Sequence, residues 1–173
     1  MQVLVVRHAI AEDPADYARR HPDDAGRPLT ADGRKKMRKA ARGLHALVPE
    51  LDLLATSPLT RAVQTAEILA DEYDGPAPVQ TPTLAPAQPL ATLADWLDRE
   101  RRREVVALVG HEPGLSRAVS WLLSGGDRSF VELKKGAACL LEFPDHVGAG
   151  LGVLRWSLSP GQLRRLGGEG GGD

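Results

Sequence analysis

The chain has one cysteine, Cys139, among its 173 residues. An intramolecular disulfide is therefore impossible, and a structural zinc site built from several thiolates is excluded by the same count. A protein without disulfides suits a reducing compartment. Because Cys139 lies in a predicted strand, we expect it to be a small buried hydrophobe rather than a nucleophile.

An excess of charge of one sign is also lacking. The 22 Lys and Arg residues stand against 23 Asp and Glu residues, so the formal net charge is −1. Such a chain has no overall field that would attract nucleic acid or an anionic membrane. Its basic run at residues 34–39 lies mostly off the apolar face of a predicted helix, which indicates a solvated surface. We therefore expect no nucleic-acid partner.

Long hydrophobic runs are missing as well. The N-terminal segment is apolar for only about five residues before Arg7, which is shorter than a signal-peptide core and far shorter than a membrane span. We expect a cytoplasmic protein, a monomer without a membrane partner. His21, His45 and His146 have no neighbours in the sequence that suggest metal ligation, and we expect neither a metal nor another cofactor.

Short apolar runs alternate with amphipathic segments. Buried strands are predicted at residues 2–6 and 105–109, and further strands at residues 51–56, 137–143 and 153–158. Apolar residues recur at helical spacing after Thr30, after Pro58, over residues 90–97 and over residues 115–122. Thr30 is the predicted N-cap of the first helix. Residues 12–27 carry many charges and no apolar period, which predicts a long loop beside a site.

This alternation predicts the α/β class. We expect a three-layer sandwich in which a largely parallel central sheet has helices on both faces. A single domain is predicted over residues 1–166. Residues 167–173, with the sequence GGEGGGD, are poor in apolar side chains, which predicts a flexible tail.

Polar residues follow three of the predicted strands. Arg7 and His8 follow the first, Ser57 and Arg61 follow the second, and His111 follows the third. Each segment alone has an ordinary interpretation: an exposed histidine, a capped helix, a turn. Parallel strands, however, bring their carboxyl ends to one edge of the sheet, where α/β proteins bind ligands. Two guanidinium groups at that edge predict a phosphate-like anion, because each can bind two oxygens at once.

The same segments carry a family resemblance. The sequences VVRHA, RPLTADG, TSPLTRAVQTAE and LVGHEP resemble the histidine phosphatase superfamily, particularly its SixA-type phosphohistidine phosphatase branch. The likeness spans residues 1 to about 160. RPLT, which adjoins a TxxG pattern at Thr30 to Gly33, points to the SixA-type branch. Many members have Gly after the nucleophilic histidine, where this chain has Ala9, the next-smallest residue.

The resemblance implies a phosphoglycerate-mutase-like fold and a two-step phosphoryl transfer without a metal. His8 would attack phosphorus and water would then release phosphate, while Arg7, Arg61 and His111 would neutralise the phosphoryl oxygens. His8 needs a free lone pair on one ring nitrogen. Its other ring nitrogen should therefore keep its proton and donate a hydrogen bond to an acceptor such as a backbone carbonyl. Ser57 and Arg27 are the expected further substrate contacts.

The general acid and the substrate stay open at this point. Glu112 follows the second histidine, as the acid does in the acid-phosphatase branch, but a glutamate there also suits the dipole of the following helix. The substrate could be phosphohistidine on a signalling or phosphotransfer protein, or a nucleotide or sugar phosphate. A non-catalytic phospho-binding module is a further alternative. A phosphoglycerate-type mutase is disfavoured, because those relatives carry their acid on an inserted segment.

Overall fold

Six strands form one mixed sheet in the computed structural model, which describes residues 1–126 and 128–169. The strands are β1 (Gln2–Arg7), β2 (Leu53–Thr56), β3 (Val79–Gln80), β4 (Val105–Gly110), β5 (Ala138–Glu142) and β6 (Val153–Leu158). Their order is β3-β2-β4-β1-β5-β6. The first four strands in this order run parallel, and β5 runs antiparallel to both of its neighbours, β1 and β6. The sheet is largely parallel, as predicted.

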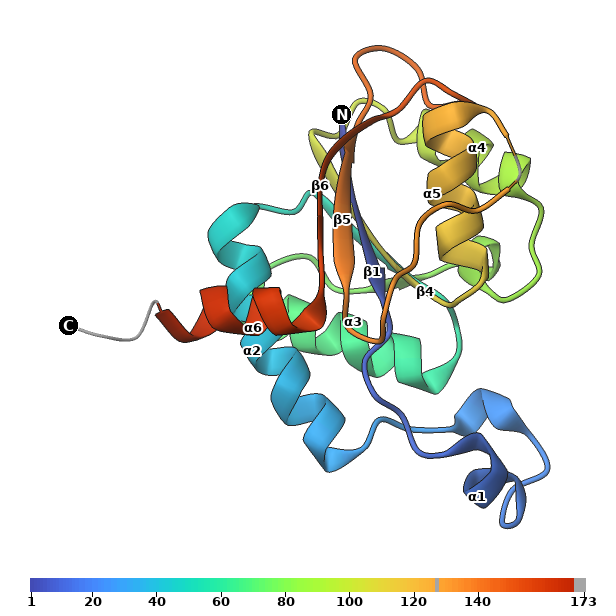
Figure 1. Cartoon of the computed structure of the whole chain (residues 1–173), viewed down its shortest axis with the longest axis vertical. Helices are drawn as coiled ribbons and strands as arrows, with labels where there is room; N and C mark the ends of the chain where they lie inside the picture. Colours follow the sequence, from blue (N-terminus) through green and yellow to red (C-terminus); the bar gives the residue numbers. More distant parts are fainter. Residues whose placement is uncertain (127, 170–173) are drawn as a thin grey trace.

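Helices cover both faces of the sheet (Figure 1). On one face lie α2 (Ala31–Leu47), α3 (Thr60–Tyr73) and α6 (Pro160–Glu169); on the other lie α4 (Leu90–Arg99) and α5 (Gly114–Ser124). Strand β1 shows why two layers are needed. Its Leu4 and Val6 belong to the core beneath α2 and α3, while Val3 and Val5 belong to the core beneath α4 and α5. The predicted three-layer α/β fold is confirmed.

Helix α2 begins where the sequence predicts. The side chain of Thr30 accepts a hydrogen bond from the Gly33 amide at 2.9 Å, which satisfies one of the free amides of the first turn. Met37, Ala41 and Leu44 are buried on one side of this helix. The apolar period therefore predicted both the helix and the face that it packs against the sheet.

The end of the chain differs from the prediction. Helix α6 extends to Glu169, so residues 167–169 are helical and not part of a flexible tail. Glycine serves close packing here: a Cβ on Gly43 of α2 would collide with the Leu163 carbonyl, and one on Gly167 of α6 with the Lys39 carbonyl. The two helices can approach this closely only without those side chains. The rest of the predicted tail, residues 170–173, lies outside the described residues.

The predicted loop at residues 12–27 contains two short helical segments, α1 (Pro14–Ala18) and the 3₁₀ turn η1 (Asp24–Gly26). Five and three residues are too few to show a repeating apolar face. An antiparallel bridge between Ala11 and Leu29 joins the two ends of the segment, which extends beyond the carboxyl end of β1 (Figure 1). The segment therefore lies beside the edge where the predicted site residues gather.

Two further sequence predictions can be compared with the fold. Cys139 is completely buried in β5, and burial raises the pKa of its thiol to about 12. It is the small buried hydrophobe that the sequence predicts. Among the described residues, no helix combines the length and the apolar character needed to span a membrane.

Candidate active site

The carboxyl ends of β1, β2 and β4 bring the predicted site residues together. These strands are neighbours, with β4 in the middle, and Arg7 of β1 pairs in register with Gly110 of β4. The His8 amide donates to the Gly110 carbonyl at 3.1 Å. The rings of His8 and His111 lie 5.0 Å apart, centroid to centroid, and each residue is only 6% exposed. The sheet therefore holds two buried imidazoles next to each other.

The hydrogen bond of His8 determines which ring nitrogen is free. Nδ1 lies 2.8 Å from the carbonyl oxygen of Ala9. Because a carbonyl only accepts hydrogen bonds, Nδ1 carries the proton and Nε2 keeps its lone pair. Burial is the main cause that lowers the pKa of His8 to about 3, and the charges of Arg61 and Arg7 act in the same direction. His8 is thus neutral at physiological pH, with Nε2 available as a nucleophile.

The turn that carries His8 is fixed from helix α3. The amide of Ala9 donates to Thr65 Oγ1 at 3.0 Å, and the Thr65 hydroxyl donates to the Arg61 carbonyl at 2.7 Å. Ala9 is 3% exposed. Both polar groups of the Ala9 backbone therefore hold the nucleophile in place, and the methyl group that distinguishes it from glycine is accommodated.

His111 is held by Ser57. Its Nε2 lies 2.8 Å from Ser57 Oγ, and Ser57 is fully buried. Nδ1 of His111 is buried and has no hydrogen-bond partner among the described residues. Burial, followed by the charges of Arg61 and Arg7, lowers the pKa of His111 to about 4. The structure places Ser57 against the imidazole of His111, and the expected contact between Ser57 and the substrate stays a prediction.

Two arginines complete the group around the imidazoles. Arg7 comes from the end of β1 and donates through Nη1 to the Leu133 carbonyl at 2.7 Å. Arg61 comes from the first turn of α3, and its side chain is 7% exposed. Within the described part of the chain, the Nε atoms of both arginines are buried without a partner. These donors, together with Nδ1 of His111, are groups that an anion could satisfy.

Asp24 is the site residue that the sequence did not reveal. Its carboxylate accepts from Arg27 Nε at 2.6 Å and lies 3.1 Å from Arg61 Nη1, whereas Arg27 also donates to the Glu12 carbonyl at 2.8 Å. The side chain of Asp24 is 52% exposed and that of Arg27 is 10% exposed. Arg27 therefore reaches the site through Asp24 and ties down the segment at residues 12–27. In the sequence, the only sign of this contact is that Asp24 stands three residues before Arg27.

The low pKa values of the two imidazoles predict how stability depends on pH. An unfolded histidine titrates near 6.5, so below about pH 6.5 the unfolded chain binds protons that the folded chain does not. The free energy of unfolding should fall as the pH drops from about 6.5 towards 4, and be fully retained above that window. Urea unfolding at neutral and mildly acidic pH should show a larger loss for the wild type than for His111→Asn. Equal losses would mean that His111 is not held neutral by burial.

Comparisons with known proteins identify this arrangement. The model of the histidine phosphatase superfamily, branch 1, matches residues 3–85, which include Arg7, His8 and Arg61. Phosphohistidine phosphatase SixA of Escherichia coli K12 is 27% identical over 167 residues, or 95% of this chain and 97% of that protein. An uncharacterized protein of Picosynechococcus is 39% identical over 137 residues, covering 78% of this chain and 81% of that protein. The chain belongs to the histidine phosphatase superfamily.

The fold supports the same assignment for this histidine phosphatase. The structure of SixA complexed with tungstate superposes with a TM-score of 0.80 at 27% identity, covering 94% of this chain and 99% of that one. The resemblance of the sequence to the SixA-type branch and the expected α/β fold are therefore confirmed. The chain is a phosphatase by this membership.

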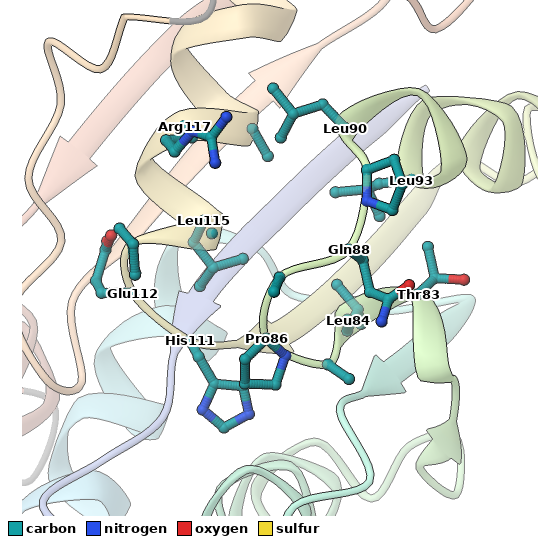
Figure 2. Close-up of a pocket in the computed structure, with 16 residues that line it drawn as sticks. Thr83, Leu84, Pro86, Gln88, Leu90, Leu93, His111, Glu112, Leu115 and Arg117 are labelled. Carbon is teal, nitrogen blue, oxygen red and sulfur yellow. The ribbon is translucent and has the colours of Figure 1, made fainter.

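Glu112 of this histidine phosphatase is not brought into the group of arginines and histidines. Its Oε2 accepts from the Ser116 hydroxyl at 2.5 Å and lies 3.4 Å from the Ser116 amide, in the first turn of α5. Figure 2 shows the side chains of His111 and Glu112 pointing in different directions from the turn that leads into this helix. The Oε1 atom of Glu112 is buried without a partner among the described residues. The contact with Ser116 fits the helix-start interpretation, and the general-acid role of Glu112 stays a prediction.

A cavity opens beside His111 (Figure 2). It has a volume of about 280 Å³ and is lined by residues 83–90, Leu93 and residues 111–115, 117 and 118. Leu84, Leu93 and Leu115 give it apolar walls, and Arg117 lies at its edge. The cavity offers room for the part of a substrate that is not phosphate. In the described residues, no three His, Cys, Asp or Glu side chains are grouped as metal ligands.

Proposed function

We propose that this protein hydrolyses phosphohistidine on proteins, through a covalent phosphoryl intermediate on His8. This proposal rests on the hydrogen bond that His8 Nδ1 donates to the Ala9 carbonyl. The bond leaves the lone pair of His8 Nε2 free, next to the buried donors of Arg7 and Arg61. The similarity to SixA over almost the whole chain supports the substrate class. A phosphorylated signalling or phosphotransfer protein is therefore the proposed partner.

In the first step, Nε2 of His8 attacks phosphorus. A new N–P bond forms, the N–P bond of the substrate breaks, and its electron pair returns to the imidazole of the substrate. Arg7 and Arg61 stabilise the negative charge on the phosphoryl oxygens with their fixed guanidinium donors. When the Ser57 hydroxyl donates to Nε2 of His111, the proton of His111 lies on Nδ1, which is then a third donor.

In the second step, water attacks the phosphoryl group on His8. The proton stays on Nδ1, which donates it in a hydrogen bond to the Ala9 carbonyl throughout, so His8 departs as a neutral imidazole and not as an imidazolate. A neutral imidazole is the far better leaving group. The water passes its protons to the released phosphate and to solvent, and the free lone pair of Nε2 is restored.

Glu112→Gln tests the role of Glu112. Because the Glu112 carboxylate is engaged by Ser116, we expect kcat/KM of the variant to stay within about threefold of the wild type for phosphohistidine and for an alkyl phosphate, whereas loss of a general acid costs about 10²-fold or more. Steady-state kinetics on both substrates checks this. Ser116→Ala, which breaks the same hydrogen bond from the other side, is the matched control. A selective loss on the alkyl phosphate would reinstate Glu112 as the acid.

A substrate panel decides between the proposed function and its alternatives. Phosphate release should be measured from a phosphohistidine protein, nucleotides, sugar phosphates and p-nitrophenyl phosphate. We expect kcat/KM to be highest for the phosphohistidine protein, and turnover to continue in EDTA because arginine and histidine supply the positive charge. A preference for nucleotides or sugar phosphates would instead establish a small-molecule phosphomonoesterase. Binding without turnover would establish a phospho-binding module.

A further inference from the structure

Asp24 is a negative charge placed at a site that binds negative charge. In the free protein its carboxylate lies 3.1 Å from Arg61 Nη1 and 2.6 Å from Arg27 Nε. Both arginines are nearly buried, and buried cations need a counter-ion. The hydrogen bond from Arg27 holds the pKa of Asp24 below its usual range, so the group is a carboxylate at neutral pH. Asp24 therefore occupies Nη1 of Arg61, while Nε of the same guanidinium has no partner among the described residues.

Asp24 is the member of this group that lies nearest to solvent. His8 is 6% exposed and lies at the floor of the site, whereas the side chain of Asp24 is 52% exposed. In-line transfer puts the leaving group opposite the attacking nitrogen, hence towards the solvent side. Glu112 lines the separate cavity beside His111, with Oε2 bound to Ser116 and Oε1 buried without a partner among the described residues. Of the acidic side chains in the described ranges, only Asp24 makes an ion pair with Arg7 or Arg61.

We propose that Asp24 is a specificity-determining residue, which favours leaving groups that depart with a proton already on nitrogen over leaving groups that must acquire one. This inference rests on the proposed function and deepens it. When the phosphoryl group binds Arg61, it displaces the Asp24 carboxylate from Nη1. The displaced carboxylate then faces the leaving group and accepts a hydrogen bond from it. The substrate's phosphorylated imidazole supplies such a bond through the N–H of its other nitrogen.

The proton balance explains the selectivity. When the N–P bond of a ring-protonated phosphohistidine breaks, the electron pair stays on the nitrogen that carried phosphorus, and the other nitrogen keeps its proton. A neutral imidazole leaves, and Asp24 gives up no proton. An alkyl phosphate releases an alkoxide that must gain a proton, and a carboxylate held by Arg27 has none to give. Asp24 therefore assists the first reaction and opposes the second.

Asp24→Asn keeps the size of the side chain and removes its charge. We expect kcat/KM for a phosphohistidine peptide to fall about tenfold, the loss of one hydrogen bond to a charged group. We expect kcat/KM for an alkyl phosphate, whose leaving group must acquire a proton, to stay the same or rise. Asp24→Glu should restore part of the preference. Asp16→Asn, which removes an exposed carboxylate paired with Arg19 in the same segment, should leave the ratio unchanged.

The outcomes separate this inference from the proposed function. If the wild type shows no preference for phosphohistidine, the proposed function and the inference fall together. If the wild type prefers phosphohistidine and Asp24→Asn lowers both activities equally, Asp24 only positions the arginines and the inference alone is overturned. Calorimetry with inorganic phosphate gives a readout without turnover. Asp24→Asn should bind phosphate several-fold more tightly than the wild type, and weaker binding would contradict the competition for Arg61.

Discussion

Replacing His8 by alanine should lower turnover about 10⁴-fold or more, the loss expected when a nucleophile is removed. The substitution removes the lone pair of Nε2, for which the site has no substitute, because His111 is engaged through its own Nε2 by Ser57. The fold should survive, since His8 lies at the end of a strand and not within the core clusters. Steady-state phosphate release and circular dichroism check the two expectations.

A matched control and a trapping experiment sharpen this test. His146→Ala removes an exposed histidine that pairs only with Asp98, and it should leave turnover unchanged. Rapid quenching of the wild type should trap a phosphoryl group that is stable to base and labile to acid, as expected of phosphohistidine, and the His8 variant should trap none. Turnover by the variant at more than about a hundredth of the wild-type rate would falsify the assignment of His8.

Replacing Arg61 by lysine should lower kcat/KM about 10²-fold, although the positive charge is retained. Arg61 uses a planar group with several fixed donors: Nη1 faces Asp24 and Nε is buried without a partner in the described residues. An ammonium group can replace one of these donors, but it cannot bind two phosphoryl oxygens in a plane. The loss should therefore appear in kcat as well as in KM, because the contacts matter most in the transition state.

Arg103→Lys is the control for this substitution. Arg103 is an exposed arginine that pairs with Glu100, far from the site residues in the fold, so its replacement should change neither parameter. Vanadate inhibition adds a second measurement, since vanadate imitates the transferred group; it should weaken in parallel with kcat/KM for Arg61→Lys. Wild-type kinetics in Arg61→Lys would show that charge alone is sufficient at this position.

The sequence predicted those parts of the molecule that follow from local patterns. The apolar period of α2 and the Thr30 cap depend on neighbouring residues, and Arg7, His8 and His111 could be placed together because parallel strands end at one edge. Helix α6 was missed because its glycines indicate flexibility in isolation, whereas the contact with α2 requires them. Tertiary context decided that segment.

The contacts of individual site residues could not be predicted in the same way. Asp24 pairs with Arg61 across 37 residues of sequence, and no local pattern marks such a partner. Ser57 and Glu112 were recognised as members of the motifs, but the sequence could not show that one binds His111 and the other Ser116. Side-chain orientation at a strand end depends on several elements at once, so these roles emerged only from the fold.

The central position of β1 has a consequence for how the chain folds. β1 pairs with β4 on one side and β5 on the other, so both its edges wait for residues 105–142 to be synthesised. Until then an apolar strand stays unpaired, and pairings this distant in sequence form slowly. His8 acquires its neighbour His111 only when β4 joins the sheet. A nascent chain therefore cannot hold a phosphoryl group between these two residues until β4 has been made and has joined the sheet.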